Sequence, residues 1–191
     1  MQKAQDQMLL DLINSFLVAF GFIAGMMIIL MLGLAYQDLR TSESFATTGI
    51  ILVRSVFAGL LAMIPNILPC IAVLGSMGLA GMTIEIGSMM TASVALGIAV
   101  DDTLHLLVEY RRGLARFVGD KQAALRHALT HVGRAISCTT LAVCAGLLVV
   151  GAGALQNQAE FGMLGAATLA IAWLVDVTVT PALCLKLIDE A

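Results

Sequence analysis

The stretch GIAVDDTLHLLVEY, from Gly97 to Tyr110, places two adjacent carboxyl groups, Asp101 and Asp102, inside a long apolar segment. His105 and Glu109 follow within the same stretch. If the segment crosses a bilayer, each charge at its centre costs about 2.5–3.5 kcal/mol on insertion scales. Ionisable residues at such depth are rare and mark functional sites. The placement of this stretch therefore decides both the fold and the function.

Composition indicates an integral membrane protein. Hydrophobic residues make up 60% of the 191 residues and charged residues only 12%, against about 45–50% and about 25% in soluble domains. The net charge of −3 and the lack of a basic tract argue against a nucleic-acid partner. The four cysteines stand singly in apolar stretches, without metal-site spacing. We expect no cofactor and no metal, with the lipid bilayer as the chain's surroundings.

The apolar stretches predict an all-α membrane protein with five transmembrane helices in a single domain, residues 1–191. A spanning helix needs about 20 apolar residues. Residues 1–11 lack the pattern of a signal peptide, so we expect the spans themselves to direct insertion. Two prolines in IPNILP (64–69) predict a kink or a re-entrant start in the second span. The predicted spans are about 12–36, 55–80, 86–109, 135–154 and 161–185.

Two further segments have mixed character. Residues 38–54 combine polar and apolar side chains, which suggests a position at the membrane interface. Residues 119–132 carry apolar side chains at helical spacing, which predicts an amphipathic cytoplasmic helix.

The positively charged residues predict the orientation. With five alternating spans, nine of the ten Lys and Arg residues fall on one side, and Lys3 alone falls on the other. Cytoplasmic loops carry the excess of Lys and Arg. We therefore expect the N-terminus outside and the C-terminus in the cytoplasm. The nine residues are Arg40, Arg54, Arg111, Arg112, Arg116, Lys121, Arg126, Arg134 and Lys186.

The third span carries a stripe of residues spaced by four: Ser93, Gly97, Asp101, His105 and Glu109. Residues four apart share one helix face. The small Ser93 and Gly97 would let another helix approach closely, so we predict helix packing there. Asp101 lies ten residues before Arg111, about 15 Å deeper at 1.5 Å per residue, which is near the membrane midplane.

The acidic pair predicts a proton relay. Adjacent carboxylates repel and a low dielectric favours the neutral acid, so we expect at least one of Asp101 and Asp102 to have a raised pKa and to be either charged or neutral near physiological pH. The alternative is that Asp101 only pairs with a buried donor and holds helices together. His105 would pass protons, pair with Asp101 or act as a polar cap. Glu109, before two arginines, predicts a boundary ion pair.

Three other residues are relay candidates. Thr139 and Thr140 in the fourth span would donate hydroxyls to a carboxylate, or would bond back to their own helix. Asp176 is ten residues before Lys186, also near mid-depth. It would be a second ionisable partner, or it would satisfy backbone groups freed by Pro181.

We expect no enzymatic activity. Adjacent helical residues point about 100° apart, so Asp101 and Asp102 cannot share a water as an aspartyl protease dyad does. Asp101 with Asp176 lacks the flanking patterns of membrane aspartyl proteases. His127 and His131 are four apart, a spacing that metals use, but without an apparent third ligand we interpret them as a solvated face.

An ordered set of motifs resembles the resistance-nodulation-division (RND) superfamily, and within it the MMPL-type exporters. The motifs are IPNILP, GIAVDDTLH, GRAISCTT and FGMLGAATLAIAWLVDVTVTPALC, and the resemblance covers about residues 12 to 187. It implies that Asp101 and Asp102 match the acidic motif of the fourth helix of a six-helix repeat. The five spans would then be helices two to six, a bundle like the sterol-sensing domain.

The resemblance also implies a function. Members of this superfamily commonly drive export of lipids or other hydrophobic or amphipathic substrates by inward proton flow. This sequence lacks the second repeat, the first helix and the outside domain. We therefore expect the C-terminal transmembrane half of an exporter in the bacterial inner (cytoplasmic) membrane, incomplete on its own, whose partners are the remaining repeat and outside domain. Alternatives are a sterol-sensing-like lipid sensor or scaffold, and a component that assists protein translocation.

Overall fold

The computed structural model describes residues 2–41, 45–79, 81 and 86–188. Six α-helices and a final π-helical turn, η1, account for nearly all of them, and the described residues include no strand. The prediction of an all-α protein is confirmed. The elements are α1 (Gln2–Thr41), α2 (Phe45–Leu61), α3 (Ile64–Leu79), α4 (Ile86–Arg116), α5 (Lys121–Gly151), α6 (Gln156–Leu183) and η1 (Cys184–Ile188).

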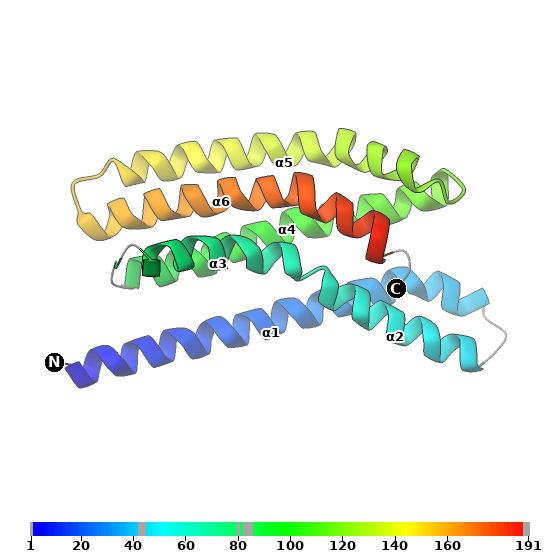
Figure 1. The fold of residues 1–191 in the computed structure, drawn as a ribbon, viewed down its shortest axis with the longest axis horizontal. Helices are drawn as coiled ribbons and strands as arrows, with labels where there is room; N and C mark the ends of the chain where they lie inside the picture. Colours follow the sequence, from blue (N-terminus) through cyan, green and yellow to red (C-terminus); the bar gives the residue numbers. More distant parts are fainter. Residues whose placement is uncertain (1, 42–44, 80, 82–85, 189–191) are drawn as a thin grey trace.

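Five helical segments are long and apolar enough to cross a membrane, as the sequence predicts. They are Ile13–Gly33, Ser55–Leu79, Met90–Arg116, Lys121–Gly151 and Gln156–Lys186. Successive segments alternate in direction, so the two ends of the chain lie toward opposite ends of the bundle (Figure 1). This alternation is the one that the distribution of Lys and Arg requires.

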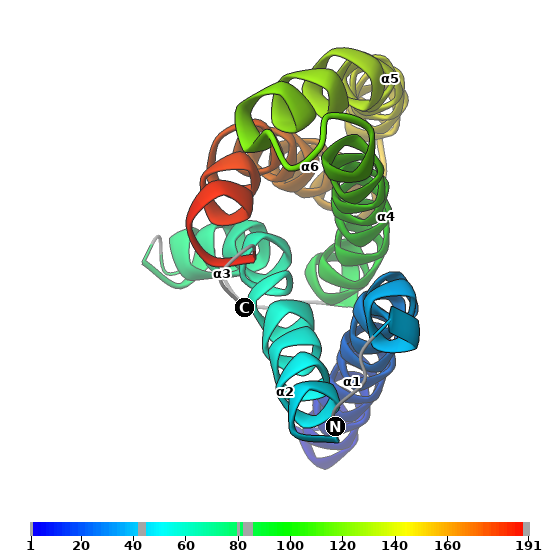
Figure 2. The same cartoon turned by 90° about the vertical axis from the view of Figure 1, so that its right-hand side faces the viewer.

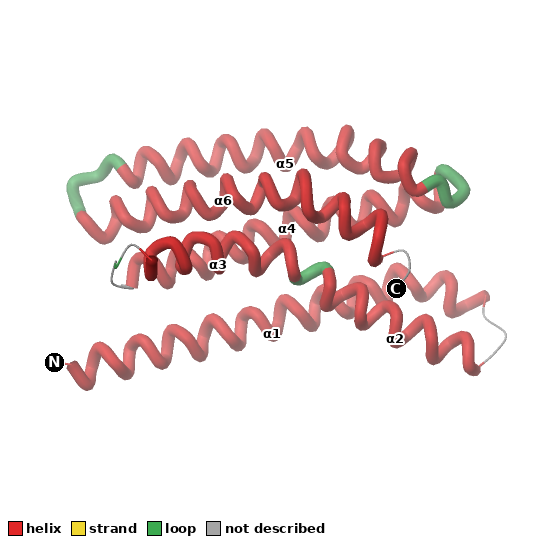
Figure 3. The backbone as a smooth tube through the Cα atoms, viewed as in Figure 1, coloured by secondary structure: helices red, strands yellow, loops and turns green. Residues whose placement is uncertain are grey.

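The second span consists of two helices separated by a short break. Figure 3 shows the loop between α2 and α3, which falls at residues 62–63, just before the first proline of IPNILP. Pro65 has no N–H, so the carbonyl of Leu61 loses its helical partner. The amide of Asn66 bonds instead to the Met63 carbonyl, at 3.1 Å. The predicted kink is therefore a complete interruption.

One long helix takes the place of the predicted surface helix (119–132) and fourth span (135–154). α5 begins at Lys121, where the Asp120 side chain accepts hydrogen bonds from two amides of the first turn, and it continues to Gly151 because no strong helix breaker intervenes. Its apolar residues Ala124, Leu125 and Ala128 are buried, and a Cβ at Gly113 of α4 would lie 3.0 Å from Ala124 Cα. This part of α5 packs on α4.

The segment 38–54 is likewise mostly helical. It comprises the end of α1 and the start of α2, and residues 42–44 lie outside the described residues. The structure thus continues two spanning helices through this segment.

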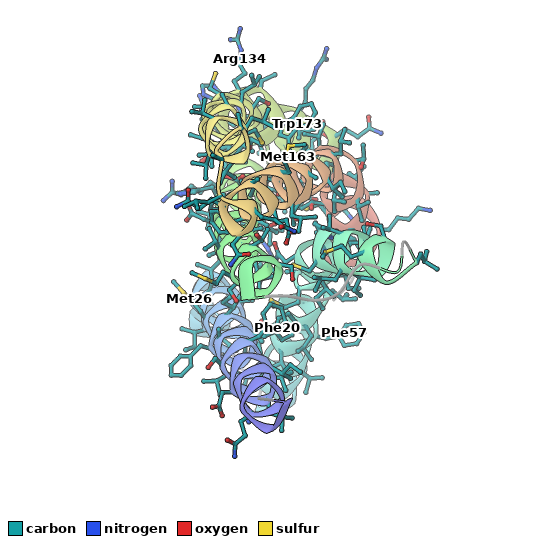
Figure 4. The ribbon with its side chains drawn as sticks, turned by 90° about the vertical axis from the view of Figure 1, so that its left-hand side faces the viewer. Phe20, Met26, Phe57, Arg134, Met163 and Trp173 are labelled. Atoms are coloured by element: carbon teal, nitrogen blue, oxygen red, sulfur yellow. The ribbon has the colours of Figure 1, made fainter. Side chains whose placement is uncertain are left out.

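α6 packs against α3, α4 and α5, and the α1–α2 pair lies at the side of α4 (Figure 2). Met26 and Phe57 point away from the neighbouring helices (Figure 4), with 61% and 54% of their surfaces exposed. Such side chains suit contact with lipid. The largest buried side chains include Met27, Met31, Leu96, Leu106, Leu107 and Tyr110.

Candidate intramembrane proton site

A cluster of four polar side chains occupies the interior where α3, α4 and α6 meet. Asp176 Oδ1 accepts hydrogen bonds from the hydroxyls of Thr103, at 2.7 Å, and Thr180, at 3.0 Å. Thr103 Oγ1 also lies 3.0 Å from Asn66 Oδ1. None of the four residues is more than 3% exposed. We call Asn66, Thr103, Asp176 and Thr180 the buried polar cluster.

The buried polar cluster lies at mid-membrane depth. Asn66 and Thr103 stand near the centres of their spans, Ser55–Leu79 and Met90–Arg116. At that depth no bulk water is available to satisfy a polar group, so each must find its partner in the protein. The short contacts among hydroxyl, amide and carboxyl groups meet this requirement across three helices.

Asp101 and His105 lie on a different face of α4. Their side chains are 71% and 68% exposed, and His105 Nε2 is 3.6 Å from Asp101 Oδ1. Ser93 and Gly97 share this exposed face, and among the described residues no atom outside its own helix and neighbours comes within 4 Å of a Cβ at Gly97. In Figure 2 this helix has α5 on one side and α1 on the other. We call Ser93, Gly97, Asp101 and His105 the open face of α4.

Asp102 connects the open face to the buried polar cluster. Its side chain is half-buried. Its neighbour in the chain, Thr103, is the hydroxyl that bridges to Asp176. The carboxyl groups of Asp101, Asp102 and Asp176 thus belong to two helices in contact, α4 and α6.

The two threonines of α5 differ from each other. Thr139 is exposed and its hydroxyl bonds to its own helix, at Ile136 O (2.9 Å) and Ala135 O (3.2 Å). Of the two alternatives for Thr139, the structure shows the hydroxyl bonded back to its own helix and not to a carboxylate. Thr140 is 7% exposed, and its Oγ1 has no hydrogen-bond partner among the described residues.

Four ionisable residues lie together at the end of the bundle that holds the α4–α5 turn: Glu109, Arg112, His127 and His131. Glu109 lies 3.8 Å from Arg112 and 3.5 Å from His127, so it forms the ion pair that its position predicts. His131 packs against His127, with ring centroids 4.5 Å apart. In the described part of the chain, no three His, Cys, Asp or Glu side chains are placed to hold a metal ion.

Asp176 bonds to two hydroxyls, so the structure places it in the cluster rather than at a backbone group freed by Pro181. Sequence reasoning missed the other three members of the cluster, Thr103, Thr180 and Asn66. Thr103 directly follows the acidic pair and points to the opposite side of the helix from Asp101, because two residues turn an α-helix by about 200°. Asn66 is an uncharged polar residue between two prolines at mid-span, which is a usable signal.

The comparisons with known proteins agree with this architecture. The model of the MMPL family matches residues 6–187. The chain is 27% identical over 158 residues to a membrane protein of Methanocaldococcus jannaschii, covering 76% of this chain and 39% of that protein. It is 28% identical over 160 residues to the multidrug resistance protein MdtC of Pantoea ananatis, covering 80% of this chain and 16% of MdtC.

The chain therefore spans less than two fifths of the length of either relative. The family match extends over all five membrane-spanning segments and includes both the open face of α4 and the buried polar cluster. The chain is an integral membrane protein that belongs to the MMPL family, within the resistance-nodulation-division superfamily.

Proposed function

We propose that this chain is the membrane part of an exporter driven by the proton-motive force, and that lipids or other hydrophobic molecules are its substrates. The observation that carries this proposal is the exposure of Asp101 and His105 at the centre of a spanning helix. A charged carboxylate facing lipid at that depth is costly. Neutralisation by a proton, or cover by another protein surface, removes the cost.

Both protonation of the carboxylate and its cover by another protein surface are expected in a proton-driven exporter. A proton on Asp101 or Asp102 abolishes a charge and changes which neighbours the helix tolerates. With the N-terminus outside, protons enter from the outside and leave to the cytoplasm. Each elementary charge that crosses the membrane releases about 2.3 kcal/mol per 100 mV, which is the energy available to drive a conformational change.

The partner we propose is the other repeat of the exporter, seated on the open face of α4. Ser93 and Gly97 extend the exposed ionisable pair toward one end of the helix, and small residues allow close helix approach. In this arrangement Asp101 and His105 become interior groups at a helix–helix contact. We propose that the outside domain of the exporter handles the substrate. Export is in keeping with the name of the relative MdtC, a multidrug resistance protein.

The test is proton-coupled flux through the complete assembly, purified from its source membranes and reconstituted in vesicles. We expect Asp101→Asn and Asp102→Asn each to abolish proton influx and substrate export without loss of folding. Thr178→Val is the matched control, because Thr178 is exposed and its hydroxyl bonds only to Leu174 of its own helix, at 2.6 Å. The 191-residue chain reconstituted alone should give no proton-coupled flux.

Two results would overturn the proposal. Export that survives both Asn substitutions would exclude a relay through the acidic pair, and lipid binding retained by the same variants would favour a sensor or scaffold. Robust proton-coupled flux through the chain alone would show that no partner is needed.

A further inference from the structure

The hydrogen bonds of the buried polar cluster require one more hydrogen than its uncharged side chains supply. The Nδ2 group of Asn66 donates to the Ala62 carbonyl, at 3.1 Å. This carbonyl borders the break between α2 and α3, and the Asn66 backbone amide bonds to Met63 instead. The reversed amide would bring two oxygen acceptors together, so Asn66 Oδ1 must face Thr103.

Thr103 cannot satisfy both of the oxygens that face it from other helices. Its hydroxyl carries one hydrogen, yet its Oγ1 lies 3.0 Å from Asn66 Oδ1 and 2.7 Å from Asp176 Oδ1, and also 3.0 Å from the Ala99 carbonyl of its own helix. Thr180 uses its own hydrogen toward the same Asp176 oxygen. With Asp176 ionised, either Asn66 Oδ1 is left without a donor, or two lone pairs face each other at 2.7 Å. Both arrangements are unfavourable in a buried site.

A proton on Asp176 completes the chain of hydrogen bonds. Thr180 donates to Asp176 Oδ1, the protonated Oδ1 donates to Thr103 Oγ1, and Thr103 donates to Asn66 Oδ1. We propose that Asp176 holds a proton in this geometry, and that the proton acts as a latch which ties α3 to α4 through the Thr103–Asn66 bond. When the proton leaves, Thr103 turns its hydrogen to the Asp176 carboxylate and the bond to Asn66 is lost.

The latch lies at the start of α3, where the helix has fewer of its own backbone hydrogen bonds. The break at residues 62–63 and the two prolines remove several helical hydrogen bonds from this region. Asn66 is the residue that ties the break to the Thr103–Asp176 pair. Loss of the Thr103–Asn66 bond therefore releases the start of α3 from α4.

The groups that surround Asp176 also link it to the acidic pair. α4 contributes Thr103 and, next to it in the chain, the ionisable Asp102. α3 contributes the neutral Asn66 through Thr103, and α6 itself contributes Thr180. Asp102 directly precedes Thr103 in the chain, so the acidic pair and the buried polar cluster share one turn of α4.

This inference deepens the proposed function, because it gives the exporter a second proton position one helix away from Asp101. Its test reads the carboxyl group itself. Infrared difference spectra of the purified protein, with isotope-labelled aspartate, report the C=O stretch of each protonated carboxylic acid as pH is raised. We expect one such band to vanish in Asp176→Asn and to remain in Asp101→Asn. In Thr103→Val the band should move to higher frequency, because the acid loses its acceptor.

Hydrogen exchange then tests the latch. Amides of residues 62–70 should exchange several-fold faster when the acid band disappears, relative to amides of α5 measured in the same sample. Asp176→Asn should hold them protected at every pH, since an Nδ2 group in the place of Oδ1 carries two hydrogens and can donate to both Thr103 and Thr180. If that variant does not fold, Thr103→Val should exchange fast at every pH. Thr178→Val should behave as wild type.

The proposal is overturned if no acid band depends on Asp176 at any pH at which the protein is folded. It is also overturned if residues 62–70 keep the same protection on both sides of the titration. These outcomes are independent of transport. Loss of flux in Asp101→Asn tests the proposed function, whereas the Asp176 band tests the latch, and either result can occur without the other.

Discussion

Thr103 Oγ1 on α4 lies 2.7 Å from Asp176 Oδ1 on α6, and this contact joins two helices at the centre of the membrane-spanning bundle. We expect Thr103→Val to lower the free energy of unfolding by about 1–3 kcal/mol, because valine keeps the shape but leaves the buried polar groups of Asp176 and Asn66 without their hydrogen-bond partner. Thr103→Ser retains the hydroxyl and should lose less. Unfolding by sodium dodecyl sulfate in mixed micelles measures both.

The control for this series is Thr178→Val. Thr178 is exposed on the same helix as Asp176 and bonds only to its own backbone, so its substitution should change stability by no more than about 0.5 kcal/mol. Equal losses in Thr103→Val and Thr178→Val would show that the interhelical hydrogen bond contributes nothing specific.

Asn66 is expected to be coupled to Thr103. Asn66→Leu removes the donor to the Ala62 carbonyl and the acceptor that faces Thr103. A double-mutant cycle with Thr103→Val should give a coupling energy of about 0.5–3 kcal/mol, the range for residues in one hydrogen-bond network. Asn157→Leu, at an exposed position near the start of α6, serves as control. Strict additivity of Asn66→Leu and Thr103→Val would contradict a shared network.

Gly162 permits the close contact between α5 and α6. A Cβ at this position would overlap the backbone of Gly151 and the Leu147 carbonyl, so Gly162→Ala must push the helices apart. We expect a loss of about 1–3 kcal/mol, as for overpacked cores. Gly146→Ala is the matched control, since no atom beyond its local backbone approaches within 4 Å of its Cβ. A Gly162→Ala protein as stable as Gly146→Ala would mean that this contact is not tight in the membrane.

The sequence predicted the five crossings because each needs only a long and mostly apolar run, and it located the acidic pair because charges stand out in such runs. It did not predict which face of α4 would be covered. The four-residue stripe implies a shared face, and the structure leaves that face open while Thr103 turns inward. Periodicity defines a face but does not identify the neighbouring helix, which depends on how α6 and α3 pack. Similarly, the prolines predicted a kink, but the role of Asn66 depends on the exact carbonyl that the kink exposes.

Trp173 offers an optical readout of the α5–α6 contact, since it is the one tryptophan in the chain. Its Nε1 donates to Ser137 Oγ at 2.9 Å, and it points from α6 toward α5 (Figure 4). Ser137→Ala leaves the indole N–H without this acceptor, so we expect a blue shift of the fluorescence and a loss of about 1 kcal/mol. Ser76→Ala, which removes a hydroxyl bonded to Val73 of its own helix, should leave the emission unchanged. An unshifted spectrum in Ser137→Ala would show that the bond is absent.

The open face of α4 predicts effects of opposite sign in the isolated chain and in the complete exporter. Asp101→Leu removes an exposed carboxyl at mid-span, so membrane insertion of α4 in the 191-residue chain should improve by up to about 2.5–3.5 kcal/mol. Glycosylation mapping of the inserted fraction measures this gain. Ser93→Leu, on the same face, replaces a residue that carries no charge and should give a much smaller gain in insertion.

In the complete assembly Asp101→Leu should abolish proton-coupled flux, because the same carboxyl then lies at a helix–helix contact. Poorer insertion of the isolated Asp101→Leu chain would instead mean that Asp101 has a stabilising partner within this chain, and that its face is not the surface on which a second repeat is seated.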